Sequence, residues 1–546
     1  MKTHLLPLVL TLSLLAITAC DTSSSDALPS GYHEAVTRAF AIHMDSPVTG
    51  ADGLPVRVRA FNGVDGSARS PSYESPLVYS QRSGVQVLRI PEGWGCKYTL
   101  DALFPDADAD ATDPDAYQVI GLNDAAIDLS SRGILTMWQT IYDIGAGIES
   151  CTSIDGVARG RTITGVAKWA EVVTRVADRL SRATEIYYRN PKVLENLALL
   201  GLKTGYIEFL PDALTTSGYA TGGLSALFPV YTAWRTAFSA APQNGLTRIQ
   251  SLVAPSLPAA GAEDVTTPGR LLCDFLARMA QQPLLLPEVL SFLSNTASPE
   301  AHLALVQAVR AALDSAGWKD VQVADAGLRL SDEAWASLLP VHSTPARRSA
   351  YLAAFLASVK ILAQDDLDLL VADRWGGPRI PPTAAAGEDL FQTSDGEAMP
   401  ALLSLSPFFR MDQDQATRVQ AHPEEWSADG AVVEVTGSST SGQSGGDTVR
   451  VLAARRAKEG LTAVIVSLPA AIPAAEGVRM RYHLDIDGLP ATPARWTMNR
   501  YRIDATSLGF QGAVEQSVVV PVDGKVRIVR DITGPAIDHV ELIPVE

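Results

Sequence analysis

The spacing of apolar residues changes once along this chain, and that change constrains the fold more than any other feature. From residue 119 to about residue 374, apolar side chains recur at steps of three and four residues, which is typical of helices with one buried face. From residue 428 to residue 546, short apolar runs separated by turn residues replace that pattern. The two regions therefore predict two different kinds of domain.

The strongest helical pattern lies between Thr164 and Asn190. Its apolar positions are Val166, Trp169, Val173, Val176 and Leu180. Ser298 and Thr344 each precede a proline, which is a common way for a helix to begin. We expect residues 101–375 to hold an acidic loop followed by a central all-α helical domain, built as a bundle or an irregular helical repeat. No transmembrane helix is expected in this region.

Eight short β-rich runs divide the C-terminal region. They are residues 431–435, 448–452, 462–468, 478–484, 495–502, 517–520, 525–530 and 537–543. Their number and spacing predict a β-sandwich of the jelly-roll type over residues 428–546. Alternating apolar and basic residues in Leu54–Phe61 predict a small β module over residues 32–100, and residues 376–427 read as a connector. The expected fold class is a multidomain α+β protein.

Residues 1–19 have the three-part layout of a secretory signal peptide. Lys2 gives a charged start, an apolar core runs from Leu5 to Ile17, and small residues precede Cys20. The apolar core is shorter than the ~20 residues that a membrane-spanning helix needs. The sequence therefore predicts export.

The end of this segment, Ile17-Thr18-Ala19-Cys20, resembles the lipobox of bacterial lipoproteins. In that family the cysteine thiol receives a diacylglycerol, the signal is cut before it, and the new amino group takes a fatty acid such as palmitate. The resemblance implies a lipoprotein of the bacterial cell envelope whose partner is the lipid bilayer, with residues 20–31 as a flexible tether. Asp21 resembles an inner-membrane retention signal of enteric bacteria, but the choice between inner and outer membrane stays open.

The other cysteines are Cys96, Cys151 and Cys273. An exported compartment permits disulfides. Cys96 and Cys151 lie in loop-like contexts, and we expect a disulfide between them. Cys273 lies in a helical apolar pattern, which favours a buried thiol.

Asp106, Asp108 and Asp110 alternate with alanine in a strongly acidic stretch. Alternating carboxylates are typical of the opening of a calcium-binding loop, but an EF-hand also needs a glycine and a glutamate where this chain has Ala111 and Tyr117. Two interpretations stay open, a solvated acidic turn and a weak calcium site. Apart from calcium, no cofactor is expected.

One predicted strand, residues 495–502, combines aromatic, amide and guanidinium groups of the kind that bind sugars. The candidate ligand-binding residues are Trp496, Asn499, Arg500 and Tyr501. Successive side chains of a strand point to opposite faces, so Trp496 and Arg500 share one face, and Asn499 and Tyr501 share the other. Core packing of Trp496 is the competing interpretation.

The last predicted strand, Ile537 to Pro544, resembles the closing strand of galactose-binding-like β-sandwiches. That group includes many carbohydrate-binding modules and the last domain of some insecticidal toxins. The resemblance implies a β-sandwich that binds a glycan or another envelope protein.

No complete catalytic motif occurs in the sequence. No two histidines have the i, i+4 spacing of a zinc helix, and the chain has no phosphate-binding loop with lysine. Its Gly-x-Ser-x-Gly string, Gly442 to Gly446, reads as a loose hairpin loop and not as the strand-to-helix turn that a nucleophilic serine needs. Catalytic residues are therefore unknown. The excess of 61 acidic over 44 basic residues gives a net charge of −17, which excludes a general nucleic-acid binder.

These features favour an envelope lipoprotein that acts as a binding or scaffolding module. The alternative is a polysaccharide-acting enzyme, a lyase or glycosidase on a helical scaffold, because some polysaccharide lyases also join a helical domain to a β-sandwich. A second alternative is a toxin or contact-delivered effector.

Replacing the lipidated thiol tests the predicted anchor. We expect the Cys20→Ser variant to lose its acyl mass and to move from the membrane to the soluble fraction, because buried acyl CH₂ groups contribute ~0.8 kcal/mol each to membrane binding. Mass spectrometry and membrane fractionation measure both effects. The Cys273→Ser variant serves as the control and should stay in the membrane fraction; equal membrane binding by the Cys20→Ser variant would refute the anchor.

Overall fold

The computed structural model describes the chain from β1 to the last strand, with gaps. The described residues are 36–50, 52–58, 62–65, 83–90, 100–131, 134–142, 151–152, 158–159, 165–187, 205–211, 218–240, 246–253, 275–282, 286–372, 390–391, 393, 397–426, 432–434, 441–442, 447–457, 460–469, 479–490, 493–508 and 512–545. The predicted signal peptide and tether, with Cys20, lie outside these residues.

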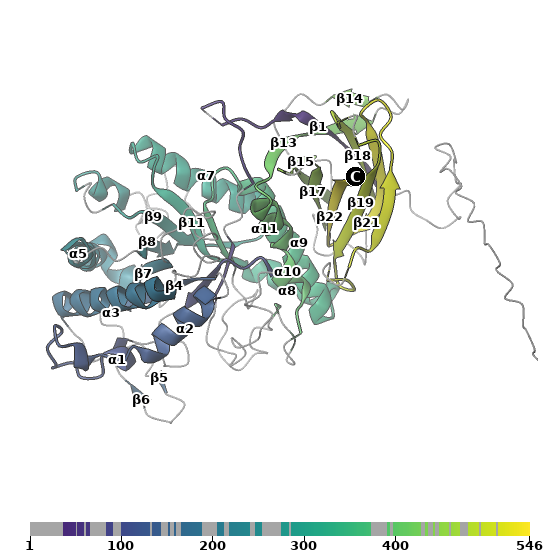
Figure 1. Cartoon of the computed structure of the whole chain (residues 1–546). Helices are drawn as coiled ribbons and strands as arrows, with labels where there is room; N and C mark the ends of the chain where they lie inside the picture. Colours follow the sequence, from purple (N-terminus) through teal and green to yellow (C-terminus); the bar gives the residue numbers. More distant parts are fainter. Residues whose placement is uncertain are drawn as a thin grey trace, which may run out of the picture.

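A closed barrel of parallel strands forms one of the two parts of the molecule (Figure 1). In order around the barrel, the strands are β2 (Asn62–Asp65), β3 (Val87–Ile90), β4 (Leu135–Tyr142), β7 (Gly205–Pro211), β8 (Leu246–Val253), β9 (Val289–Leu293), β11 (Gln322–Leu330) and β12 (Leu369–Ala372). Every neighbouring pair is parallel, and pairing of β9 with β11 closes the ring. The short β10 (Asn295–Thr296) pairs beside the end of β11. This is the architecture of a (β/α)₈ barrel.

The helices pack around the outside of the barrel. They are α1 (Leu100–Leu103), α2 (Ile120–Ser131), α3 (Val166–Tyr187), α5 (Gly218–Ala240), α7 (Pro299–Ser315), α8 (Asp332–Val341), α9 (Pro345–Ala363), α10 (Pro400–Leu403) and α11 (Ser406–Gln413). The predicted helix over 164–190 is confirmed as α3, whose Trp169, Val173 and Leu180 are buried. Ser298 and Thr344 cap α7 and α9 as their prolines predict.

The predicted all-α central domain is wrong, because eight parallel strands lie between and beneath these helices. Parallel barrel strands are covered on both faces, and some of them are therefore nearly continuous apolar runs, as in β9 (VLSFL) and β12 (LLVA). Such runs cannot be told from buried helix by periodicity. Small or apolar side chains fill the barrel; they are Val87, Leu135, Met137, Tyr206, Val289, Ala324, Ala326, Leu369 and Val371.

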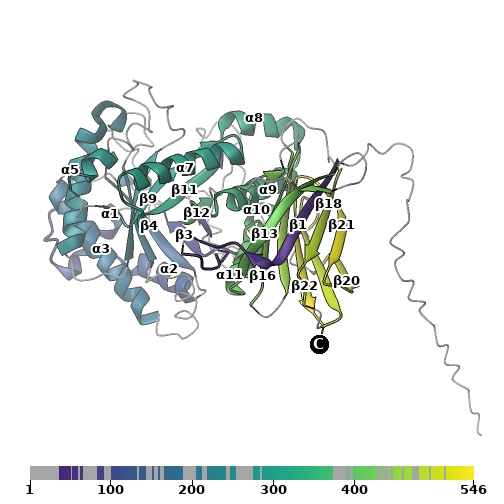
Figure 2. The same ribbon diagram turned by 90° about the horizontal axis from the view of Figure 1, so that it is seen from above.

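A β domain packs beside the barrel and contains strands from both ends of the chain (Figure 2). Its strands are β1 (Val36–Pro47), β13 (Thr417–Trp426), β14 (Val432–Glu434), β15 (Ser441–Gly442), β16 (Asp447–Arg455), β17 (Leu461–Pro469), β18 (Arg479–Asp487), β19 (Trp496–Ile503), β20 (Glu515–Val519), β21 (Val526–Thr533) and β22 (Ala536–Pro544). The order along the sheet is β20-β19-β22-β17-β16-β13-β1-β18-β21. A further short pair, β5 (Cys151–Thr152) with β6 (Ala158–Arg159), lies apart.

The predicted N-terminal β module is also wrong. β1 pairs antiparallel with β13 and parallel with β18, so it belongs to the β domain, whereas β2 and β3 belong to the barrel. For the same reason residues 428–546 are not a self-contained sandwich. Each of the eight predicted β-rich runs does overlap a strand, but these strands join one eleven-stranded sheet with β1 and β13.

Helix α9 joins the two parts of the molecule. Its side chains share one apolar core with residues of β16, β17 and β22, including Phe355, Val464 and Ile537. Within that contact the buried Arg450 donates to Ser358 Oγ at 3.1 Å and pairs with Glu300 of α7. Among the described residues, no helix is both long and apolar enough to cross a membrane.

Gly84, just before β3, combines a backbone conformation and a close contact that no residue with a side chain can adopt without strain. Its φ is +78°, and an added Cβ would lie 2.7 Å from Ser406 Cα at the start of α11. We expect Gly84→Ala to lower the free energy of unfolding by more than ~1 kcal/mol, because backbone strain and a backbone clash add.

Gly53→Ala is the matched control. Its φ of +73° is similar, but an added Cβ would meet no atom within 4 Å. Urea unfolding of both variants separates the clash from the strain. Equal losses of stability would refute the close approach of Gly84 to Ser406.

Candidate functional site

The carboxyl ends of all eight barrel strands lie on one rim, which is where barrels of this kind place their functional residues. β2 ends at Asp65 on this rim. In the sequence, Asp143, Asp212 and Asp373 come directly after β4, β7 and β12. These three aspartates lie outside the described residues.

A buried ion pair lies inside the barrel. Arg89 of β3 donates from Nε to Glu208 Oε2 at 2.6 Å and from Nη2 to Glu208 Oε1 at 3.0 Å. The two side chains are 3% and 0% exposed. Arg89 follows the inward-facing Val87 by two residues, and Glu208 follows the inward-facing Tyr206 by two residues, so both charges point into the barrel.

The pairing determines what Glu208 can do. Both of its carboxylate oxygens accept hydrogen bonds from one guanidinium, and this bidentate geometry is the strongest form of the arginine–carboxylate contact. A carboxylate held in this way is suited to fixing the position of β7 relative to β3 across β4. It is poorly suited to acting as a free acid or nucleophile.

The carboxylate of β11 points the other way. Ala324 and Ala326 face the interior, so the side chain of Asp325 lies outside the barrel, beneath α7. Asp325 Oδ2 lies 2.8 Å from His302 Nε2 and accepts from Ser294 Oγ, and Gly327 N donates to Oδ1 at 3.0 Å. A catalytic triad would need the serine to bond the histidine; here both bond the aspartate, so this cluster is a buried structural contact.

Burial changes the pKa of two further groups near the barrel. Tyr206, inside the barrel, is fully buried, and desolvation raises its pKa well above the usual value. Lys360 of α9 is also buried, and desolvation lowers its pKa to about 8, although Asp412 and Asp368 oppose that shift. Tyr206 therefore stays neutral at physiological pH, whereas the pKa of about 8 brings Lys360 much closer to titration than an exposed lysine.

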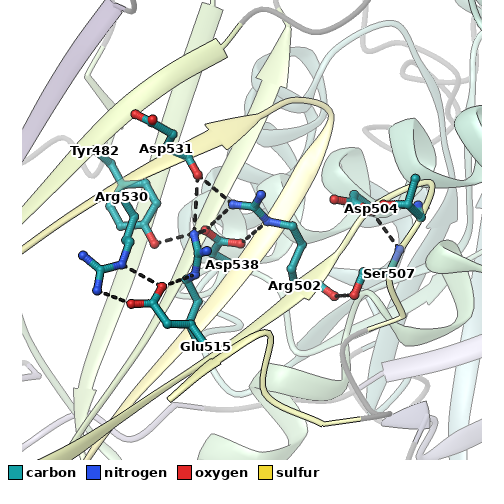
Figure 3. Close-up of polar contacts among 10 residues, drawn as sticks. Tyr482, Arg502, Asp504, Ser507, Glu515, Arg530, Asp531 and Asp538 are labelled. Atoms are coloured by element: carbon teal, nitrogen blue, oxygen red, sulfur yellow. Dashed lines mark hydrogen bonds and ion pairs between the residues drawn. The ribbon is translucent and has the colours of Figure 1, made fainter. Parts of the chain in front are cut away.

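The sheet of the β domain folds over so that β18 and β21 face β19 and β22 across one core, and a charged network lies between these two layers (Figure 3). Asp538 of β22, fully buried, accepts from Tyr482 Oη at 3.0 Å and from Arg502 at 2.7 and 2.9 Å. Arg500 lies 3.3 Å from the same carboxylate and 3.2 Å from Glu515, which also pairs with Arg530. Burial and the Asp538 charge raise the pKa of Tyr482, so the phenol stays a donor.

The four predicted sugar-binding residues divide between two faces of β19. Trp496 is buried in the core between the layers, and Arg500 belongs to the charged network on the same side. Asn499 is 9% exposed, and Tyr501 faces the barrel, where the Arg410 guanidinium lies 5.3 Å from its ring. The structure does not bring the four side chains onto one exposed face; their binding of a glycan stays a prediction.

The aspartates of the acidic loop cap their own turns. Asp106 accepts from the backbone N–H of Asp108, and Asp110 accepts from the backbone N–H and hydroxyl of Thr112, contacts that lower the pKa of Asp110. Within the described part of the chain, no three His, Cys, Asp or Glu side chains are grouped to hold a metal ion. Calcium binding by Asp106, Asp108 and Asp110 stays a prediction.

The predicted disulfide falls outside the described side chains. Cys96 is not described, and of Cys151 only the backbone, in β5, is described. The sequence analysis missed Arg89 and Glu208. The available signal was a single charge inside each of two short apolar strands, Val87–Ile90 and Gly205–Pro211.

No protein-family model matches the chain, and no curated protein matches it. Solved structures do resemble it. A glucosidase from Croceicoccus marinus has a TM-score of 0.60 at 16% identity, covering 94% of this chain and 100% of that chain. A GH39 enzyme from Xanthomonas axonopodis pv. citri gives 0.60 at 13% identity, covering 95% and 100%. A monomeric β-xylosidase from Caulobacter crescentus gives 0.58 at 12% identity, covering 93% and 100%. The chain therefore shares the fold of these proteins over nearly its whole length.

Removing one partner of the Arg89–Glu208 pair tests its burial. We expect Glu208→Gln to lower the free energy of unfolding by about 3–5 kcal/mol, because it removes the carboxylate charge that the buried Arg89 guanidinium binds through two hydrogen bonds. Replacing both residues by methionine should recover most of that loss.

The control is the exposed pair of Glu171 and Arg175, whose side chains are 44% and 41% exposed. Glu171→Gln should change stability by less than ~0.5 kcal/mol. Urea unfolding measures all three variants. A loss for Glu208→Gln no larger than that of the control would contradict the buried pair.

Proposed function

We propose that this protein is a glycoside-acting enzyme that binds its carbohydrate substrate at the carboxyl end of the barrel. The observation that carries the proposal is the closed parallel barrel with the Arg89–Glu208 pair inside it, on strands that lead to the functional rim. The likeness in fold to structures described as a glucosidase and a β-xylosidase supports it, since the likeness spans the barrel and the β domain together. It favours the enzyme over a binding or scaffolding module.

Hydrolysis of a glycosidic bond generally requires two carboxyl groups, one that donates a proton to the leaving oxygen and one that acts as nucleophile or base. Glu208 is bound to Arg89, and Asp325 points away from the barrel. We therefore assign the two roles to carboxylates at the ends of barrel strands. The candidates are Asp65, which ends β2, and Asp143, Asp212 and Asp373, which follow β4, β7 and β12 in sequence.

Asp143 and Asp212 are the favoured pair, because they follow two strands that lie next to each other in the barrel. The register pairs Tyr142 of β4 with Pro211 of β7, and Asp143 and Asp212 are the next residues in sequence. Arg89 and Glu208 act as positioning residues, because they tie β7 to β3 just before β7 ends. Acyl chains on Cys20 would hold the enzyme at the cell envelope, next to surface or periplasmic polysaccharide.

A hydrolysis assay tests the proposal. Aryl β-glucosides, aryl β-xylosides and a panel of polysaccharides are incubated with the full chain, and release of the aryl group or of reducing sugar is measured. We expect turnover of at least one substrate. Asn replacement of Asp65, Asp143, Asp212 and Asp373 in turn should lower kcat by ~10²–10⁴-fold for the two catalytic members, with little change in stability.

Asp523→Asn is the matched control. Asp523 lies in the turn between β20 and β21 with φ of +52°, a conformation that asparagine also tolerates. This variant should keep full activity. Sugar binding by calorimetry without turnover of any substrate would overturn the enzyme and leave a binding protein.

A further inference from the structure

One histidine of the β domain is buried where that domain contacts the barrel. His539 of β22 is 3% exposed, and its Nε2 atom lies 2.8 Å from Thr462 Oγ1 of β17. Its ring centroid lies 5.8 Å from that of Tyr501 of β19. Helix α11 of the barrel lies beside these strands (Figure 2), and the guanidinium of its Arg410 lies 5.3 Å from the Tyr501 ring.

Two arginines place positive charge around this imidazole. Arg410 comes from the barrel, and Arg456 from the β domain just after β16. Arg456 links the two parts, because its Nη2 atom lies 2.8 Å from Asp414 Oδ2 at the end of α11 and its Nη1 atom lies 3.8 Å from Glu541 Oε1 of β22. Burial, together with the charges of Arg410 and Arg456, lowers the pKa of His539 to about 3.

The carboxylate beside His539 already has other partners. Glu541 Oε1 lies 3.9 Å from His539 Nε2, which is beyond hydrogen-bond distance. The Tyr501 hydroxyl donates a hydrogen bond to this carboxylate, and Arg456 faces it. Glu541 is therefore not placed to bind a protonated imidazole.

The remaining elements around β22 direct their charged groups elsewhere. Asp538 precedes His539, so its side chain points to the opposite face of β22, into the network of Figure 3. Helix α9 also packs on β22, and over residues 349–363 its one charged residue is Lys360, which interacts with the charges of Asp412 and Asp368. The site is therefore suited to a neutral imidazole, and a proton on His539 adds a third positive charge to a buried contact.

We propose that His539 makes the contact between the barrel and the β domain sensitive to acid. The neutral imidazole allows α11 to pack against β17, β19 and β22, and its protonation weakens that packing.

The pH range follows from the difference between the folded and unfolded chains. An imidazole in the unfolded chain takes up a proton near its ordinary pKa of 6.5, whereas burial keeps the pKa of His539 in the folded chain near 3. As the pH falls, the unfolded chain binds the proton first. The contribution of His539 to stability is therefore complete above about pH 6.5 and is lost as the pH falls toward 3.

Urea unfolding of the full chain at pH 7 and at pH 4.5 tests the proposal. Carboxylates also titrate in this range, so the measured quantity is the difference between the native chain and His539→Gln, whose amide takes up no proton. Acidification should raise the unfolding equilibrium constant of the native chain by about 100-fold more than that of His539→Gln, because pH 4.5 lies two units below the ordinary histidine pKa. Equal acid responses would overturn the proposal.

His43→Gln is the matched control. The side chain of His43 is 33% exposed on β1, and its Nδ1 atom lies 2.8 Å from Asp487 Oδ1, so it does not belong to the buried contact. This variant should keep the acid response of the native chain.

Two measurements on the native chain do not depend on how well His539→Gln folds. In NMR of ring-labelled histidines, the His539 resonance should show no protonation down to pH 4.5; a midpoint near pH 6.5 would overturn the proposal. Backbone hydrogen exchange over residues 405–416, corrected for the intrinsic effect of pH, should be faster at pH 4.5 than at pH 7 as the packing of α11 weakens. Unchanged exchange in that segment would also overturn it.

Discussion

The pairing of β9 with β11 closes the barrel, and the rest of the structure depends on that closure. A parallel sheet that remained open would expose two edges and one apolar face, whereas a closed sheet satisfies the backbone hydrogen bonds of every strand. Because all eight strands are parallel, their carboxyl ends lie on one side of the sheet, and closure arranges these ends in a ring. The helices that the sequence indicates are then confined to the outside, where α9 provides the surface on which the β domain packs.

Closure leaves little room inside, and the side chains there are mostly small or apolar. Placing Arg89 and Glu208 in this interior costs desolvation energy that the bidentate contact offsets. Such pairs do little for stability, so their value lies in specifying geometry. Asp325, in contrast, points out of the barrel, where its carboxylate contacts His302 of α7. The catalytic carboxylates that we propose are therefore among Asp65 and the aspartates that follow β4, β7 and β12 in sequence.

Local features could be predicted from the sequence, whereas the topology could not. The apolar spacing that includes Trp169 and Leu180 predicted α3, and the turn residues of the C-terminal region predicted where the strands from β16 to β22 are separated. The strands β9 and β12 are short, nearly continuous apolar runs that resemble buried helix. The contact of β1 with β18 joins residues more than 400 positions apart, and no local pattern encodes it. Arg89 and Glu208 likewise become partners only when the barrel closes.

The most direct test of carbohydrate chemistry at the barrel rim is a crystal structure of the full chain with a bound sugar or sugar-like inhibitor. The account predicts that the sugar occupies the carboxyl end of the barrel, next to the ends of β3 and β7, the strands that hold Arg89 and Glu208. Sugar bound to the β domain alone would contradict the account.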